Sequence, residues 1–303
     1  MYTKFCDLHK KQLIYLSEYF IISLFVNVGN AIFMGRNEVL MIKLIATDLD
    51  GTMLDDSKRL PENFDTVLQN LNSRNIRFAV SSGRSFCTLK QQFQRYMDDL
   101  IFICDNGAYV YDKGEVVSMS VLPDDAVHNM VRFCEEQDLL ILLCGKHGTW
   151  HNGREAAELE EIRKYYVNEK YMEDLSTFDD EIFKVAVFER KGSIETTAYP
   201  KLRARYGDYF NVQLSGDRWV DIMNRGITKG SALHKMQDRL GVDYGETMSF
   251  GDYLNDIEML ENSYYSFSME NSHSLVKKAA NFSTGSNNDN SVMKEIIKLC
   301  FNS

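Results

Sequence analysis

The sequence predicts an α/β fold: a Rossmann-like, doubly wound parallel sheet with an inserted second α/β domain, here called the cap domain. Short apolar runs at residues 44–47, 76–80, 101–104 and 247–250 each end in a cluster of small or polar residues. Amphipathic helical patterns separate these runs, and alternation of strands with helices is typical of a parallel sheet covered on both faces. Residues 116–216 carry their own mixture of helical and strand patterns without an acidic strand end.

This change of pattern divides the chain into domains. Residues 41–115 and 217–303 form the core, and residues 116–216, a stretch of ordinary domain size, form the cap domain. Residues 1–40 are interpreted as an N-terminal extension, with Met41 directly before the first strand. Their uncharged part is shorter than the ~20 apolar residues that a membrane span needs. An accessory helix, a start assigned too early and a membrane anchor all stay open.

The first strand ends in two carboxylates, Asp48 and Asp50, followed by Gly51 and Thr52. Ligands of open α/β sheets bind at the carboxyl ends of the strands, so chemistry is expected here. Paired carboxylates suit a divalent cation, and a carboxylate can also attack phosphorus to form an aspartyl-phosphate. The alternative is an ordinary Asp-Gly turn, and the remaining strand ends decide between the two.

Two later strand ends repeat this arrangement. Ser82, Gly83 and Arg84 follow the second strand, and the hydroxyl and amide groups there suit a phosphate oxygen. Asp252 and Asp256 follow the strand at 247–250 and are four residues apart, so one helical turn places both on the same side.

Lys229 lies at the start of a predicted helix, where the helix dipole disfavours a cation. This placement predicts that its ammonium group faces an anion.

Composition limits the partners that the protein is expected to bind and indicates the compartment in which it is expected to lie. The formal net charge of −10 disfavours nucleic acid and an anionic membrane surface as partners. The six cysteines include no C-x-x-C pair, which is typical of reduced thiols in a cytoplasmic protein.

Four ordered motifs carry a resemblance to a known family. They are Asp48-Leu49-Asp50-Gly51-Thr52, Ser82-Gly83-Arg84, Lys229-Gly230 and Gly251-Asp252-x-x-Asn255-Asp256. Together they resemble the haloacid dehalogenase superfamily, and the Asn106-Gly107-Ala108 turn with the inserted domain resembles its Cof-type branch. The resemblance spans residue 41 to the C-terminus and implies a Mg²⁺-dependent phosphatase with an α/β cap.

The resemblance also implies a role for each motif residue. Asp48 would be the nucleophile, and Asp50 would protonate the leaving group and then activate water. The implied metal ligands are Asp48, the Asp50 backbone carbonyl and Asp252. The phosphate-binding residues implied are Leu49, Ser82, Gly83, Lys229 and Asn255, with Arg84 and Asp256 in support.

The expected substrate is a small phosphorylated metabolite, with sugar phosphates preferred, and the chain is expected to be a monomer or a homodimer. The cap-domain loop at residues 145–152 is a candidate for specificity, through His147 and Trp150. An ordinary hairpin is the alternative interpretation of that loop. A phosphomutase, a signalling phosphoacceptor and a non-catalytic binding module remain as alternative functions.

Overall fold

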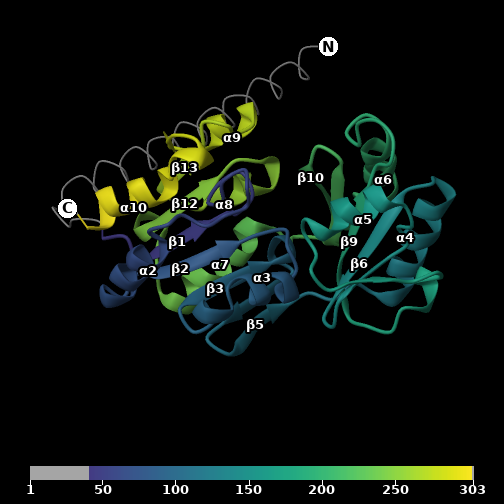
Figure 1. Cartoon of the computed structure of the whole chain (residues 1–303), viewed down its shortest axis with the longest axis horizontal. Coiled ribbons are helices and arrows are strands. Elements are labelled where there is room, and N and C mark those ends of the chain that lie inside the picture. Colours follow the sequence, from purple (N-terminus) through teal and green to yellow (C-terminus); the bar gives the residue numbers. More distant parts are fainter. Residues whose placement is uncertain (1–40, 302–303) are drawn as a thin grey trace, which may run out of the picture. The chain divides into compact units, whose positions relative to one another are not determined.

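The structure, a computed structural model, describes residues 41–301. The core is built on an eight-stranded sheet in the order β14-β13-β12-β1-β2-β3-β4-β5 (Figure 1). The predicted extension at residues 1–40 lies outside the described residues. The core strands are β1 (Leu44–Thr47), β2 (Arg77–Ser81), β3 (Leu100–Cys104), β4 (Tyr109–Asp112), β5 (Glu115–Met119), β12 (Thr247–Gly251), β13 (Tyr265–Ser268) and β14 (Phe282–Ser283). Neighbours from β14 to β3 pair in parallel, whereas β4 and β5 are antiparallel. The predicted parallel-sheet core is confirmed.

Helices cover both faces of this sheet. They are α2 (Phe64–Ser73), α3 (Phe86–Gln92), α7 (Lys229–Leu240), α8 (Ile257–Glu261), α9 (Ser274–Ala279) and α10 (Ser291–Cys300). Alternate residues of β1 point to opposite faces. Ile45 packs in a cluster with residues of α2 and α10, whereas Leu44 and Ala46 pack in another with residues of α7 and α8. Burial on both faces explains why the strand is a continuous apolar run.

The order of the strands creates a crevice beside β1. The chain adds β2 and β3 on one side of β1 and later returns to add β12 and β13 on the other side. The strand order therefore reverses between β1 and β12. In doubly wound sheets, the carboxyl ends of the strands at such a reversal border the ligand site.

The cap domain is built on a six-stranded sheet in the order β10-β11-β9-β6-β7-β8. Its strands are β6 (Leu140–Gly145), β7 (Thr149–His151), β8 (Glu169–Tyr171), β9 (Ile182–Phe188), β10 (Phe210–Gly216) and β11 (Trp219–Asn224), and its helices are α4 (Asp124–Glu136), α5 (Ala156–Arg163) and α6 (Ala198–Tyr206). Apart from the parallel β7–β8 pair, its strands are antiparallel. Short hairpins join β6 to β7 and β10 to β11, whereas α5 lies between β7 and β8 and α6 between β9 and β10.

Both boundaries of the cap domain lie later in the chain than predicted. β5 pairs with β4 and so belongs to the core sheet, although residue 116 was expected to open the cap domain. At the other end, β11 pairs with β10 and β9 in the cap sheet, although the core was expected to resume at residue 217. The apolar run of β11 resembles a core strand because it is buried between two neighbours of its own sheet.

Two further observations concern the described part of the chain. None of the helices between residues 41 and 301 combines the length and the apolar character that crossing a bilayer requires. The cysteines in this range are free thiols: Cys87, Cys104, Cys134, Cys144 and Cys300.

Candidate active site

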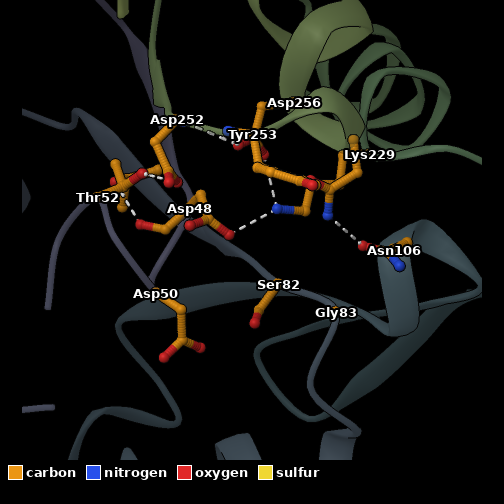
Figure 2. Close-up of polar contacts among 12 residues, drawn as sticks. Asp48, Asp50, Thr52, Ser82, Gly83, Asn106, Lys229, Asp252, Tyr253 and Asp256 are labelled. Atoms are coloured by element: carbon orange, nitrogen blue, oxygen red, sulfur yellow. Dashed lines mark hydrogen bonds and ion pairs between the residues drawn. The ribbon is translucent and has the colours of Figure 1, made fainter. Parts of the chain in front are cut away.

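The motif residues gather at the carboxyl ends of β1, β2 and β12, as the sequence predicts (Figure 2). Asp48 follows β1, Ser82 follows β2, and Asp252 follows β12. Lys229 begins α7, whose N-terminus is capped by the Thr228 side chain. Segments separated by more than a hundred residues thus contribute to one site.

Three carboxylates form the centre of the site. Oxygen atoms of Asp48, Asp252 and Asp256 all lie within 4.8 Å of one another. Burial, together with the charge of Asp256, raises the pKa of Asp48 to about 7, although Lys229 opposes the shift. Burial and the charge of Asp48 likewise raise the pKa of Asp252 to about 8. Negative charge is concentrated here beyond what the surroundings neutralise, and a bound cation would relieve it.

Lys229 is the buried cation of this centre. Its side chain is 1% exposed, and its ammonium lies 2.6 Å from Asp48 Oδ1 and 2.7 Å from Asp256 Oδ1. Burial alone would lower the pKa of Lys229, but the two carboxylates raise it above its ordinary value. The lysine is therefore charged, and it faces anions as its position at a helix start predicts.

The three carboxylates have different capacities for a metal ion. Asp256 accepts hydrogen bonds from the amides of Asp252 and Tyr253 on Oδ2 and from Lys229 on Oδ1, so both of its oxygens are engaged. The carboxylate of Asp252 accepts only the Thr52 hydroxyl, at 2.9 Å, among the hydrogen bonds within residues 41–301. The residues present thus fit a hard divalent cation, with oxygens left on Asp48 and Asp252.

Gly51 leaves room for this arrangement. Its φ of +82° lies in the left-handed region, and a Cβ atom there would lie 2.5 Å from Asp252 Oδ2. A side chain at this position would displace the carboxylate that comes from the other half of the core.

Asp50 is not part of the acidic centre. Figure 2 shows its side chain directed away from Asp48 and Lys229. Arg84 donates two hydrogen bonds of 2.8 Å to its carboxylate, and Lys58 lies 2.6 Å from it. Burial opposes ionisation, but Arg84 and Lys58 lower the pKa of Asp50. The structure thus gives Arg84, expected only to support the site, a direct contact with Asp50.

The other predicted phosphate-binding residues surround the same space. Ser82, Gly83 and Asn255 line a cavity together with Asp48 and Asp50. The side-chain amide of Asn255 donates from Nδ2 to Asn106 Oδ1 at 3.0 Å, so Asn255 contacts the turn after β3. The Leu49 side chain is buried in the core, so only its backbone is available to a ligand.

The cavity has a volume of about 570 Å³ and a second wall made by the cap domain. That wall consists of Glu161, Tyr165, Tyr166, Lys184, Asp221 and the hairpin turn at residues 215–219. No motif of the sequence marks these residues. Ser215-Gly216 is a turn signal, but which part of the cap domain contributes to the cavity depends on the pairing of strands distant in sequence.

His147 and Trp150, the predicted specificity residues, do not line the cavity. The side chain of His147 is 71% exposed and contacts Asp180. Trp150 packs on the cap-domain core with Lys170 over its ring. The register of the cap sheet explains the position of Trp150, which pairs with Leu143, as Leu143 does with Val185. Because successive residues of a strand point to opposite faces, Trp150 lies on the face opposite to that of Lys184, which lines the cavity.

The doubly wound core, the cap domain and the acidic crevice define the class of this protein, a capped α/β enzyme. The chain belongs to the haloacid dehalogenase-like hydrolase family, whose pattern matches residues 45–296. This confirms the resemblance drawn from the motifs, including its Cof-type branch.

Named relatives and solved structures agree with this assignment. The chain is 31% identical to the Escherichia coli 5-amino-6-(5-phospho-D-ribitylamino)uracil phosphatase YbjI, over 85% of this chain and 96% of that protein. It is 25% identical to the Bacillus subtilis phosphatase YitU, named for the same compound, over 83% of this chain and 95% of the relative. The structure of SMU.1108c from Streptococcus mutans superimposes with a TM-score of 0.80 at 27% identity, covering 85% and 98% of the two chains. The chain is accordingly a phosphatase of this superfamily.

Proposed function

We propose that this protein is a Mg²⁺-dependent phosphatase that hydrolyses a small phosphorylated metabolite through an aspartyl-phosphate on Asp48. The observation that carries the proposal is the contact of Asp48 with Lys229 inside an acidic centre that opens into the cavity. Lys229 donates to Oδ1 of Asp48, which keeps a lone pair for a metal ion, and Oδ2 is left to attack phosphorus. When bound by Asp48, the Asp50 carbonyl and Asp252, Mg²⁺ would neutralise charge on the phosphoryl oxygens.

The first step transfers the phosphoryl group to the enzyme. The Asp48 carboxylate forms a bond to phosphorus while the ester oxygen leaves, and Lys229 with the Ser82 hydroxyl stabilises the equatorial oxygens. The departing oxygen needs a proton, which we assign to Asp50. To act as an acid, Asp50 must leave Arg84 and Lys58 and take up that proton, because its pKa is lowered in the present arrangement.

The second step returns the enzyme to its starting state. Water attacks phosphorus, the bond to the Asp48 carboxylate breaks, and inorganic phosphate leaves. Asp50 accepts the proton of the attacking water, and its pairing with Arg84 and Lys58 favours the ionised form that a base needs.

For the substrate, we propose a phosphorylated sugar or sugar alcohol that carries a ring at its far end. The support is the rings of Tyr165 and Trp219 in the cap wall of the cavity, which suit stacking on a planar group. Three relatives are named as phosphatases of 5-amino-6-(5-phospho-D-ribitylamino)uracil, a compound of this kind. It is the first compound to test.

The test measures release of inorganic phosphate by the purified full chain from p-nitrophenyl phosphate and from that uracil compound. We expect activity with Mg²⁺, its loss with EDTA, and no activity for Asp48→Asn. Asp55→Asn is the matched control, because Asp55 is a carboxylate of the same loop that pairs with Arg59 outside the cavity. Full activity of Asp48→Asn, or of the metal-free protein, would contradict the proposal.

A further inference from the structure

Lys184 belongs to the cap domain, yet its ammonium group contacts the core. It lies on β9, and its side chain is 1% exposed. The Nζ atom donates to the carbonyl oxygen of Gly83 at 2.5 Å. It also lies 3.3 Å from Asp105 Oδ1 and 3.6 Å from Asp221 Oδ2. One buried cation thus joins the cap domain to the loop that follows β2.

The contact with Gly83 completes the hydrogen bonds of that loop. The carbonyl of Ser82 accepts the amide of Asn106 at 3.0 Å, and the carbonyl of Arg84 accepts the amide of Asp105, also at 3.0 Å. The carbonyl between them, that of Gly83, accepts Lys184 of the cap domain. A carbonyl that is withdrawn from water and lacks a donor is destabilising, so the loop depends on this lysine for its shape.

The turn after β3 is held from the cap domain in the same way. Asp105 and Asn106 have φ values of 47° and 53°, in the left-handed region that disfavours side chains. Asp105 faces Lys184, and Asn106 Nδ2 donates to Asp221 Oδ2 at 2.5 Å. Asn106 in turn accepts the amide of Asn255 beside the acidic centre. Two cap residues therefore stabilise a strained turn that contacts two motif segments.

The ammonium of Lys184 is surrounded by protein groups. It donates one hydrogen bond to the Gly83 carbonyl, and the carboxylates of Asp105 and Asp221 lie beside it as ion-pair partners. Although Lys184 lines the cavity, its contacts are all to protein groups that shape the phosphate-binding loop.

We propose that Lys184 is a positioning residue, which holds the Ser82–Gly83 loop in its phosphate-binding form only when the cap domain is docked on the core. This inference rests on the proposed phosphatase function. It makes binding of the phosphoryl group dependent on the cap domain for every substrate, whatever its leaving group. A residue that contacted the leaving group would affect large substrates alone.

The test compares Lys184→Met with the wild type in Mg²⁺, using p-nitrophenyl phosphate as substrate and inorganic phosphate as competitive inhibitor. We expect KM and the inhibition constant of phosphate to rise together by about tenfold or more, with a smaller change in kcat. Lys170→Met on β8 is the matched control, since Lys170 is an exposed cap lysine over the Trp150 ring, and it should change neither constant.

The substitution leaves Asp105 and Asp221 buried without their cation, which can destabilise the fold. The double variant Lys184→Met/Asp221→Asn removes one of these charges and still lacks the donor to Gly83, so the same loss of phosphate affinity is expected. Titration calorimetry measures the phosphate affinity of the wild type and the variants without turnover. If the wild type is inactive, the proposed function is wrong, but the role of Lys184 in phosphate binding is still tested. A folded variant with phosphate affinity within twofold of the wild type, or one impaired only on large substrates, would overturn it.

Discussion

The two walls of the cavity take their residues from different kinds of structure. The core wall draws Asp48, Ser82 and Asp252 from the ends of parallel strands that meet at one edge of the sheet. The cap wall draws Tyr165 from the segment after α5 and Trp219 from the first residue of β11 in the β10–β11 hairpin. Strand ends bring chemical groups together by topology alone, whereas a hairpin does so only if its sheet faces the core. We therefore expect the core wall to decide the reaction and the cap wall to decide the substrate.

The largest expected effect tests the core wall through its two aspartates. Asp50→Asn should lower turnover of alkyl phosphates by about 10²–10⁴-fold, because both proton transfers lose their group. With p-nitrophenyl phosphate, whose leaving group needs little protonation, Asp48 should still be phosphorylated and the adduct should accumulate. The measurement is intact mass after rapid acid quench, and Asp48→Asn should show no added phosphoryl group. Wild-type turnover by Asp50→Asn, or an adduct on another residue, would show that the roles are assigned wrongly.

The difference between strand ends in the core wall and hairpins in the cap wall also explains how much of the structure the sequence alone could predict. Strands β1, β2, β3 and β12 were predicted within a residue or two, because burial on both faces leaves an apolar run that ends abruptly. The positions of Asp48 and Asp252 in one site followed from the same rule about strand ends, and that of Lys229 from its place at the start of a helix. The resemblance of these motifs to those of a known family added a predicted role for each residue.

Other features were beyond the sequence for physical reasons. The direction of the Asp50 side chain depends on Arg84 and Lys58, which come from separate loops. The face of the cap sheet that contributes to the cavity depends on pairing between strands distant in sequence. Local patterns therefore favoured the hairpin of His147 and Trp150, and gave no sign that Lys184 reaches the core.

A second prediction uses the metal to test the core wall without turnover. Burial and the charges of neighbouring carboxylates raise the pKa of Asp48 to about 7 and that of Asp252 to about 8, from the ordinary value of 3.8. Both groups bind protons more tightly in the folded chain, so their contribution to stability is greatest below pH 4 and is lost as the pH rises to about 8. Without metal, Tm should fall by several degrees between pH 6 and 8.5, and Mg²⁺ should restore it.

The control for this measurement is Asp252→Asn, which removes one of the two titrating groups. Its Tm should depend less on pH over the same range and respond less to Mg²⁺. A wild-type Tm that is equal at the two pH values without metal, or unchanged by Mg²⁺, would contradict a metal site at this acidic centre.

The smallest expected effect is on the cap wall, and it separates the residues that face the cavity from those that the sequence favoured. Tyr165 lines the cavity, and its ring contacts that of Trp219 at 6.2 Å between centroids. Tyr165→Ala removes a stacking surface worth roughly 1 kcal/mol. We expect kcat/KM for a ring-bearing sugar phosphate to fall about fivefold to tenfold, while that for p-nitrophenyl phosphate changes by less than twofold.

The matched variant is Trp150→Ala, which removes an aromatic ring of the same domain outside the cavity. It should lower Tm, because the ring packs on the cap-domain core, and leave the ratio of kcat/KM for the two substrates unchanged. Tyr165→Phe provides a second comparison, since it keeps the ring and should retain the preference of the wild type. If Trp150→Ala shifts the substrate ratio as strongly as Tyr165→Ala, the β6–β7 hairpin reaches the substrate after all. In that case residues outside the cavity wall would also decide specificity, and the assignment of substrate preference to the cap wall would be wrong.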